Sequence, residues 1–111
     1  MKPIIVTTTT ATKDEAVKIA DILLNENLAA CVQISQPVLS CYRWEGEIKR
    51  DEEFVCSIKT EASHFNAIAR VIEKVHSYDV PQIIAVPIVH GSVDYLSWVQ
   101  NQVDEHSTAD T

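Results

Sequence analysis

The stretch from Leu28 to Thr60 constrains the fold of this chain more than any other part of the sequence. Apolar and β-branched residues fill both of its halves, and Gly46 lies between them. Glycine accepts the positive φ that a two-residue hairpin turn requires. The stretch therefore predicts two antiparallel strands, one from Leu28 to Trp44 with an interruption at Pro37, and one from Ile48 to Thr60.

This predicted hairpin is long for the size of the chain. At about 3.3 Å per residue, a strand of the 17 residues 28–44 extends roughly 50 Å. A compact domain of about 100 residues is only about 35 Å across. The hairpin should therefore project beyond its own domain, with Leu39, Trp44 and Ile48 near its tip. Apolar strands with free edges pair readily with other chains, so we expect an obligate oligomer in which neighbouring subunits cover the hairpin.

The other segments alternate between strand and helix patterns. The predicted elements are a strand at 4–10, a helix at 13–27, the two hairpin strands, a helix at 63–75, a strand at 83–89 and a final helix from about 92. In the first helix Ala16, Ile19, Ala20 and Leu23 form the apolar stripe, with Val17 and Leu24 beside it. Thr12 and Ser63 are the candidate N-caps. The order βαββαβ is the ferredoxin-like α+β pattern, here with an extra C-terminal helix.

The prolines agree with this topology. Proline cannot donate a hydrogen bond to a sheet ladder, so central strands exclude it. In the ferredoxin-like order the second and fourth strands lie at the edges of the sheet. Pro37 falls in the second strand and Pro87 in the fourth, while the third strand has no proline.

Length and composition indicate one globular domain over residues 1–111, with a frayed tail at 106–111. The net charge of −7 argues against a nucleic-acid partner, and the longest apolar run, Ile83–Val89, is too short to cross a membrane. Cys31, Cys41 and Cys56 form no C-x-x-C pair, and no export signal is visible. We therefore expect a cytoplasmic protein whose three cysteines are reduced and act as small buried hydrophobic residues.

His76 and Tyr78 form the most suggestive polar cluster, in a loop before Pro81. A histidine in such a loop can bind a metal ion or titrate near neutral pH. Alternatively, His76 can cap the last carbonyl groups of the preceding helix, where a cation interacts favourably with the helix dipole. His64, on the predicted outer face of that helix, is expected to be solvated.

Two aromatic pairs are candidates for an interface or a ligand cleft. Tyr42 and Trp44 alternate onto one face of the hairpin, and Tyr95 and Trp98 lie three residues apart on the last helix. Such residues commonly form cores and interfaces, and they can also wall a small-molecule cleft between subunits. Lys59 is the candidate cation for an anionic ligand there. Its alternative role is an edge lysine with its stem along the surface.

Several motifs occur in a recognisable order. They are Leu28-Ala-Ala-Cys-Val-x-Ile34, Ser40-x-Tyr42-x-Trp44-x-Gly46-x-Ile48, Glu53, Lys59-Thr60, His76-x-Tyr78 with Pro81-x-Ile83, and Tyr95-Leu-x-Trp98. With these motifs the chain resembles the CutA family of divalent-cation tolerance proteins, from about residue 4 to 99. The resemblance implies a ferredoxin-like homotrimer with interlocking hairpins, an architecture similar to the PII signalling proteins, and clefts between subunits. It also implies a link to copper and other divalent metals.

The chain departs from the family pattern at the positions associated with metal. The family commonly has His-Pro-Tyr-Glu-x-Pro-Glu, whereas this chain has Ser77, Asp79 and Gln82 at the second, fourth and seventh places. Gln82 lacks the carboxylate that would be a hard-metal ligand. A first-strand cysteine and a histidine pair, linked to copper in some members, correspond here to Thr8 and to Val75-His76. The resemblance therefore implies no required cofactor, with His76 as the anchor if copper or another divalent metal binds.

Four functions follow as hypotheses. The first is a non-catalytic CutA-type homotrimer in divalent-metal tolerance, which binds metal or a small ligand between subunits. The candidate cleft residues are Tyr42, Trp44, Lys59, His76, Tyr78, Gln82, Tyr95 and Trp98. The second is a PII-like regulator that binds a small anionic metabolite. The third is an enzyme comparable to acylphosphatases, for which no phosphate cradle is evident, and the fourth is a purely structural trimeric scaffold.

Overall fold

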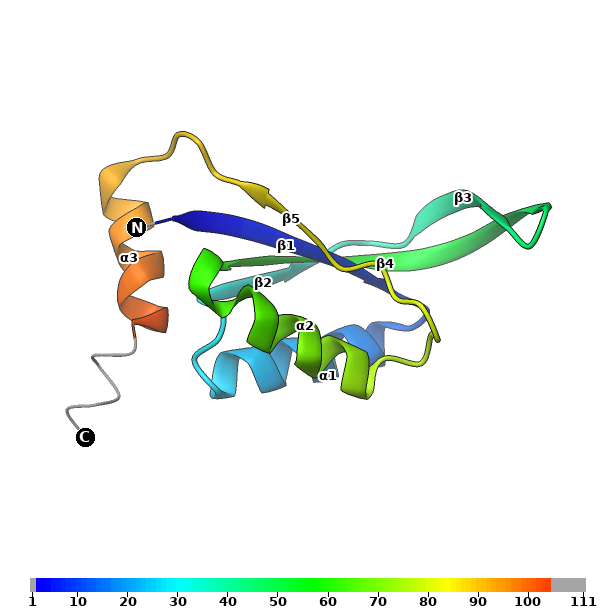
Figure 1. Cartoon of the computed structure of the whole chain (residues 1–111), viewed down its shortest axis with the longest axis horizontal. Coiled ribbons are helices and arrows are strands. Elements are labelled where there is room, and N and C mark those ends of the chain that lie inside the picture. The colour runs from blue at the N-terminus through cyan, green and yellow to red at the C-terminus, as the bar shows by residue number, and fades with distance from the viewer. Residues whose placement is uncertain (1, 105–111) are drawn as a thin grey trace.

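The computed structural model describes residues 2–104, and the expected tail at 106–111 lies outside this range. The elements are β1 (Pro3–Thr10), α1 (Lys13–Asn25), β2 (Cys31–Ile34), β3 (Val38–Trp44), β4 (Glu47–Glu61), the 3₁₀ helix η1 (Ala62–His64), α2 (Phe65–Val75), β5 (Ile84–Pro87) and α3 (Val93–Val103). Helices α1 and α2 cover one face of the sheet, and α3 lies near the start of β1 (Figure 1). No helix among the described residues is long and apolar enough to cross a membrane.

The sheet has the strand order β2-β4-β1-β5, and each neighbouring pair is antiparallel. This is the predicted ferredoxin-like order, with the second predicted strand divided into β2 and β3. The edges are β2 with β3 on one side and β5 on the other, which confirms the inference from Pro37 and Pro87. The fourth predicted strand is shorter than expected. It ends at Pro87, which has no N–H to donate.

The long hairpin is present and projects from the body of the molecule (Figure 1). Glu45 and Gly46 both have positive φ, at 50° and 81°, as a two-residue type I′ turn requires. We call residues 38–53 the arm; there β3 pairs only with the outer half of β4. Between β2 and β3 the chain remains hydrogen-bonded to β4 through Ser35. The Ser35 N–H donates to the Val55 carbonyl, and the Ser35 hydroxyl accepts from the Val55 N–H. The described chain measures 50 × 29 × 22 Å, so the arm makes it elongated, as the length argument predicted.

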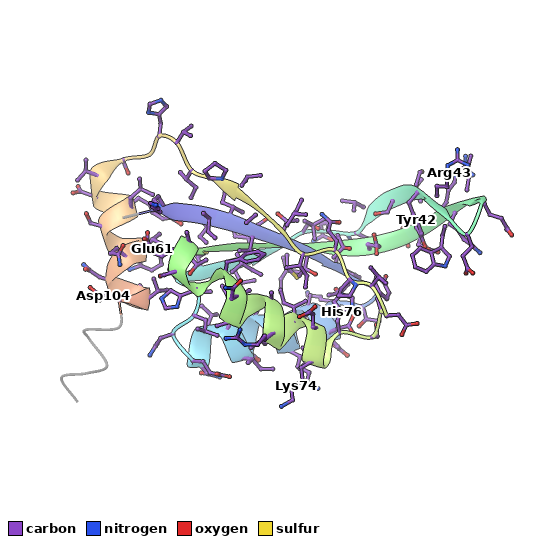
Figure 2. All side chains as sticks on the ribbon, in the orientation of Figure 1. Tyr42, Arg43, Glu61, Lys74, His76 and Asp104 are labelled. Atoms are coloured by element: carbon purple, nitrogen blue, oxygen red, sulfur yellow. The ribbon has the colours of Figure 1, made fainter. Side chains whose placement is uncertain are left out.

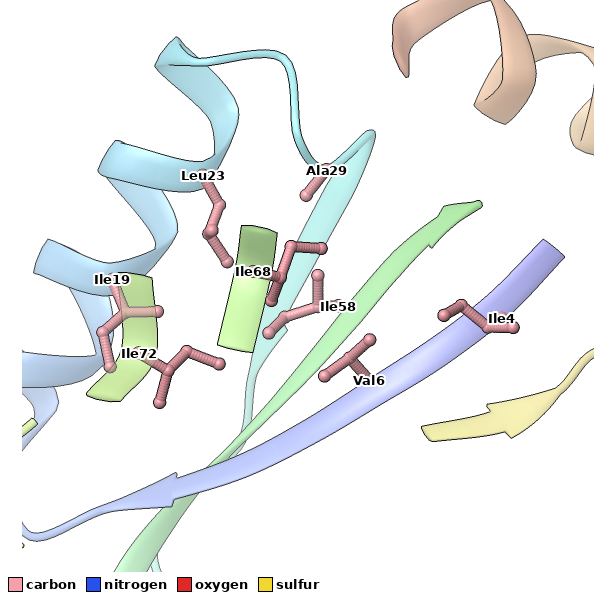
Figure 3. Close-up of a cluster of buried hydrophobic side chains, with 8 residues drawn as sticks. All are labelled: Ile4, Val6, Ile19, Leu23, Ala29, Ile58, Ile68 and Ile72. Carbon is pink, nitrogen blue, oxygen red and sulfur yellow. The ribbon is translucent and has the colours of Figure 1, made fainter. Parts of the chain in front are cut away.

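The core lies between the helical layer and the sheet (Figure 3). Its buried members are Ile4, Val6, Ile19, Leu23, Ala29, Ile58, Ile68 and Ile72. Thr12 caps α1 as predicted, because its hydroxyl accepts from the Glu15 N–H at 3.2 Å. Helix α1 ends at Asn25 instead of Asn27, and Asn27 has a left-handed φ of 58° that ends the helical path.

Two expectations at the start of α2 were wrong. Ser63 does not cap the helix, because it lies inside η1 and α2 has no side-chain cap. His64 is buried and not solvated, and its Nε2 lies 2.7 Å from the Val103 carbonyl at the end of α3. His64 lies four and eight residues before Ile68 and Ile72, the buried residues of α2, so its spacing places it on the buried side of the helical pattern and not on the outer face.

The cysteines differ from one another in exposure. Cys56 in β4 is fully buried, as expected, but Cys31 is only partly buried and Cys41 on the arm is exposed. The expectation of three buried thiols was therefore correct only for Cys56. Strand position explains the difference, because Cys56 faces the helical layer whereas Cys41 lies on the arm, beyond the layer that covers the sheet.

Candidate functional site

A pocket of about 780 Å³ lies between the arm and the loop that follows α2. Residues from the end of β1, from β3 and β4 of the arm, and from loop residues 78–82 line it. We call it the arm pocket. It contains Tyr42, Trp44, Tyr78 and Gln82 of the predicted cleft residues. Figure 2 shows Tyr42 extending from the arm on the side where His76 and its loop lie.

Hydrogen bonds to carboxylates of β4 hold the two phenols of the arm pocket. The Tyr42 hydroxyl donates to Asp51, and the Tyr78 hydroxyl donates to Glu53 Oε2 at 2.8 Å. Glu53 is buried and also accepts from the Thr9 hydroxyl at 3.3 Å. Glu53 therefore connects three parts of the chain, namely β1, the arm and the loop after α2.

These contacts raise the pKa of both phenols. The hydrogen bond to Asp51 is the main cause that raises the pKa of Tyr42. Burial is the main cause that raises the pKa of Tyr78, followed by the hydrogen bond to Glu53. Both phenols therefore stay protonated around neutral pH and act there as hydrogen-bond donors, not as bases or nucleophiles.

His76 does not cap α2 with its side chain, and its role as a metal ligand stays a prediction. Its backbone N–H caps α2 by donating to the Ile72 carbonyl, but its ring faces the end of β1. Nε2 lies 2.7 Å from the Thr9 carbonyl, and Nδ1 accepts from the Tyr78 N–H at 3.0 Å. These partners assign the proton to Nε2, because a carbonyl accepts and an amide N–H donates. Both ring nitrogens are thus occupied, and a metal ion would have to displace one of these partners.

The other positions considered for metal do not complete a site. Among residues 2–104 no group of three or more histidine, cysteine, aspartate or glutamate side chains is arranged to hold a metal ion. Thr8 is fully buried, and its hydroxyl lacks a hydrogen-bond partner among the described residues. A hydroxyl is a poor copper ligand compared with thiolate or imidazole. The side chains that the structure describes therefore do not fit a resident copper ion.

The remaining predicted residues form a second cluster near the other end of β4. Lys59 Nζ donates to Gln33 Oε1 at 2.8 Å and lies 5.7 Å from the centre of the Tyr95 ring. The Tyr95 and Trp98 rings are 5.7 Å apart. Ten residues of β4 separate Lys59 from Lys49, the partner of Tyr42, which is about 33 Å along a strand. One protomer thus does not unite Lys59, Tyr95 and Trp98 with the arm pocket, and their union between subunits stays a prediction.

The sequence interpretation missed the charged lining of the arm pocket. Lys49, Asp51 and Glu53 lie at alternate positions of β4, so they share one face of the arm. Asp79 from the loop also lines the pocket. Alternation along the second hairpin strand was the signal that could have identified the β4 residues.

Comparison with known proteins settles the family. The family model described as "CutA1 divalent ion tolerance protein" matches residues 4–102. This chain belongs to the CutA1 family. The match confirms the resemblance found in the sequence. CutA proteins are named as tolerance proteins and not as enzymes.

Curated CutA relatives match along most of the chain. "Protein CutA 1, chloroplastic" of Oryza sativa subsp. japonica is 38% identical over 92% of this chain and 58% of the relative. "Divalent-cation tolerance protein CutA" of Thermus thermophilus is 38% identical over 86% of this chain and 93% of the relative. The chain thus spans little more than half the length of the rice relative and nearly all of the Thermus relative.

Solved CutA structures have the same fold. CutA1 from Oryza sativa has a TM-score of 0.91 and 37% identity, covering 95% of this chain and 96% of that one. The "Periplasmic divalent cation tolerance protein CutA" from Archaeoglobus fulgidus has a TM-score of 0.89 and 35% identity, covering 92% and 99%. These similarities confirm the fold class. The names of relatives include chloroplastic and periplasmic proteins, so a cytoplasmic location stays a prediction for this chain.

Proposed function

We propose that this CutA family chain acts in divalent-metal tolerance as a non-catalytic homotrimer that binds a small ligand in pockets bordered by its arms. The observation that carries the proposal is the exposed apolar arm. Leu39 is 64% exposed and Ile48 is 61% exposed, and Trp44 also lies open to solvent. Apolar side chains gathered on a projecting hairpin indicate a surface that another subunit covers.

The sheet edges give a second argument for assembly. β3 pairs only with β4, which leaves its outer backbone groups without a strand partner among the described residues. β5 is the opposite edge, and Ile84 and Val86 on it are about half exposed. Two unprotected edges with apolar side chains favour symmetric association of identical chains.

Sedimentation of an arm variant tests the assembly. We expect the parent protein to sediment with three times the 12.4 kDa mass of the chain. Leu39→Lys combined with Ile48→Lys should weaken association at least about tenfold and produce monomer, because it buries charge in the interface. The matched control is Val17→Lys with Leu24→Lys on α1, where both side chains are partly exposed away from the arm. A parent that stays monomeric at all concentrations would disprove the trimer.

A copper titration tests His76 as a metal anchor. Because both ring nitrogens of His76 already have hydrogen-bond partners, we expect His76→Ala to leave the calorimetric copper titration unchanged. The same substitution should lower the free energy of unfolding by about 1–3 kcal/mol, because it leaves the Thr9 carbonyl and the Tyr78 N–H unpaired. Loss of a tight copper site in this variant would reinstate His76 as a ligand.

A further inference from the structure

We propose that the arm pocket binds an organic ammonium ion. The proposal deepens the proposed function, because it names the ligand class of the same pocket, and it replaces the anionic ligand that the sequence suggested. At about 780 Å³ the arm pocket has the size of typical small-molecule sites, which hold roughly 300–1,000 Å³. Its walls come from four separate segments, so a ligand there would contact β1, both arm strands and the loop after α2.

The apolar part of the pocket is aromatic. Tyr42, Trp44 and Tyr78 all line it, and Tyr42 and Trp44 are partly exposed. The face of an aromatic ring carries negative charge density and attracts ammonium groups, most strongly for tryptophan. Aromatic walls of this kind also accommodate the hydrocarbon part of an amine. They therefore suit a ligand that combines an apolar body with a positive charge.

The formal charge of the residues that line the pocket also favours a positively charged ligand. Asp51, Glu53 and Asp79 contribute carboxylates, and Lys49 is the only cationic side chain among the described lining residues. An anion would meet this excess of negative charge, whereas an ammonium ion would be attracted by it. The hydrogen bond between Tyr42 and Asp51 is the main cause that raises the pKa of Tyr42, and the charge of Glu53 raises it further. Both effects reflect the negative electrostatic potential in the pocket.

Hydrogen-bonding capacity distinguishes the two ligand classes further. The hydroxyl protons of Tyr42 and Tyr78 are already donated to Asp51 and Glu53, so neither phenol has a proton left for an anion. Among the described residues, Glu53 accepts the side-chain hydrogen bonds of Thr9 and Tyr78 on Oε2, so Oε1 can accept from a ligand. An ammonium group has three donors and no acceptor, which complements this set of acceptors.

Fluorescence of Trp44 provides a direct test. The chain has two tryptophans, so a Trp98→Phe background makes Trp44 the sole reporter, and Trp44 lines the pocket. The probes are n-butylammonium, n-butanol and butanoate, which share an apolar chain and differ in charge. They are titrated at pH 7.5 in amine-free phosphate buffer at constant ionic strength. We expect a saturable change with n-butylammonium alone, in the millimolar range.

Charge-removing variants connect binding to the pocket. Asp51→Asn with Asp79→Asn should weaken n-butylammonium binding about tenfold, and both residues are exposed, so the fold should persist. The matched control, Asp21→Asn with Glu73→Gln, removes the same charge from exposed helix positions and should bind like the parent. Thermal unfolding followed by circular dichroism verifies that all variants fold.

The outcomes separate this proposal from the proposed function. Three results would each disprove the ammonium site, namely no saturable response to n-butylammonium, an equal response to n-butanol, or tighter binding of butanoate. None of them would contradict the proposed trimer. If n-butylammonium does not bind and the Asp51 and Asp79 variant weakens assembly, a neighbouring subunit fills the pocket and the ligand proposal is wrong. Saturable binding by a protein that sediments as a monomer would support the site and refute the trimer.

Discussion

Replacement of Leu23 by alanine is expected to lower the free energy of unfolding by about 2–5 kcal/mol. Leu23 is fully buried on α1 and belongs to the core between the helices and the sheet (Figure 3). Its truncation removes apolar contacts and leaves a cavity that the close-packed surroundings fill only partly. Guanidinium denaturation at a fixed protein concentration measures the change, because the stability of an oligomer depends on concentration.

Leu24 supplies the matched control for this substitution. It is the next residue on the same helix but is 41% exposed, so Leu24→Ala makes the same chemical change at the surface. We expect the free energy of unfolding of Leu24→Ala to stay within about 0.5 kcal/mol of the parent value. Equal losses at both positions would show that the burial pattern of α1 is wrong.

Cys56 should be almost inert toward thiol reagents in the folded protein. Burial is the main cause that raises its pKa to about 11, with a smaller contribution from the charge of Glu15. In a Cys31→Ser, Cys41→Ser variant Cys56 is the sole thiol. At pH 8 its reaction with a disulfide reagent should be at least about 100-fold slower than in the same chain unfolded in denaturant, since only the thiolate reacts. Fast labelling under native conditions would contradict the burial of Cys56.

The raised pKa of Cys56 also predicts loss of stability at alkaline pH. The folded state holds the thiol proton more tightly than the unfolded state, whose cysteine has an ordinary pKa near 9. The stabilising contribution is therefore complete below about pH 9 and is lost as pH rises toward about 11. In Cys56→Ala the free energy of unfolding should fall less steeply over this window. Tyr42 and Tyr78 titrate with the same sign in both proteins, so the difference isolates Cys56.

The sequence predicted most of the fold because local patterns and chain geometry agreed. In α1 the predicted stripe is buried while Val17 and Leu24 beside it are exposed. The prolines identified both sheet edges, and the length of the hairpin predicted its projection. The spacing of His64 from Ile68 and Ile72 was the signal for its burial, but its contact with the Val103 carbonyl depends on the packing of α3, which no local periodicity reports.

The candidate site was predicted only in part. Tyr42, Trp44, Tyr78 and Gln82 do line one pocket, but Lys59, the cation predicted for the same cleft, lies outside the pocket of a single protomer. The rise of a strand separates Lys59 from the arm within one protomer, and Lys49 lies there instead. The role of His76 depends on the Thr9 carbonyl, 67 positions away in the chain, and residue spacing does not reveal such a contact.

β4 runs without a break from Glu47 to Glu61, so a single backbone segment belongs both to the arm and to the centre of the sheet. Its outer end forms the tip of the arm, which is exposed to other molecules, and its inner end packs Cys56 and Ile58 against the helices. Displacement of the tip can therefore be transmitted along the β4 backbone to the part of the sheet that packs against the helices.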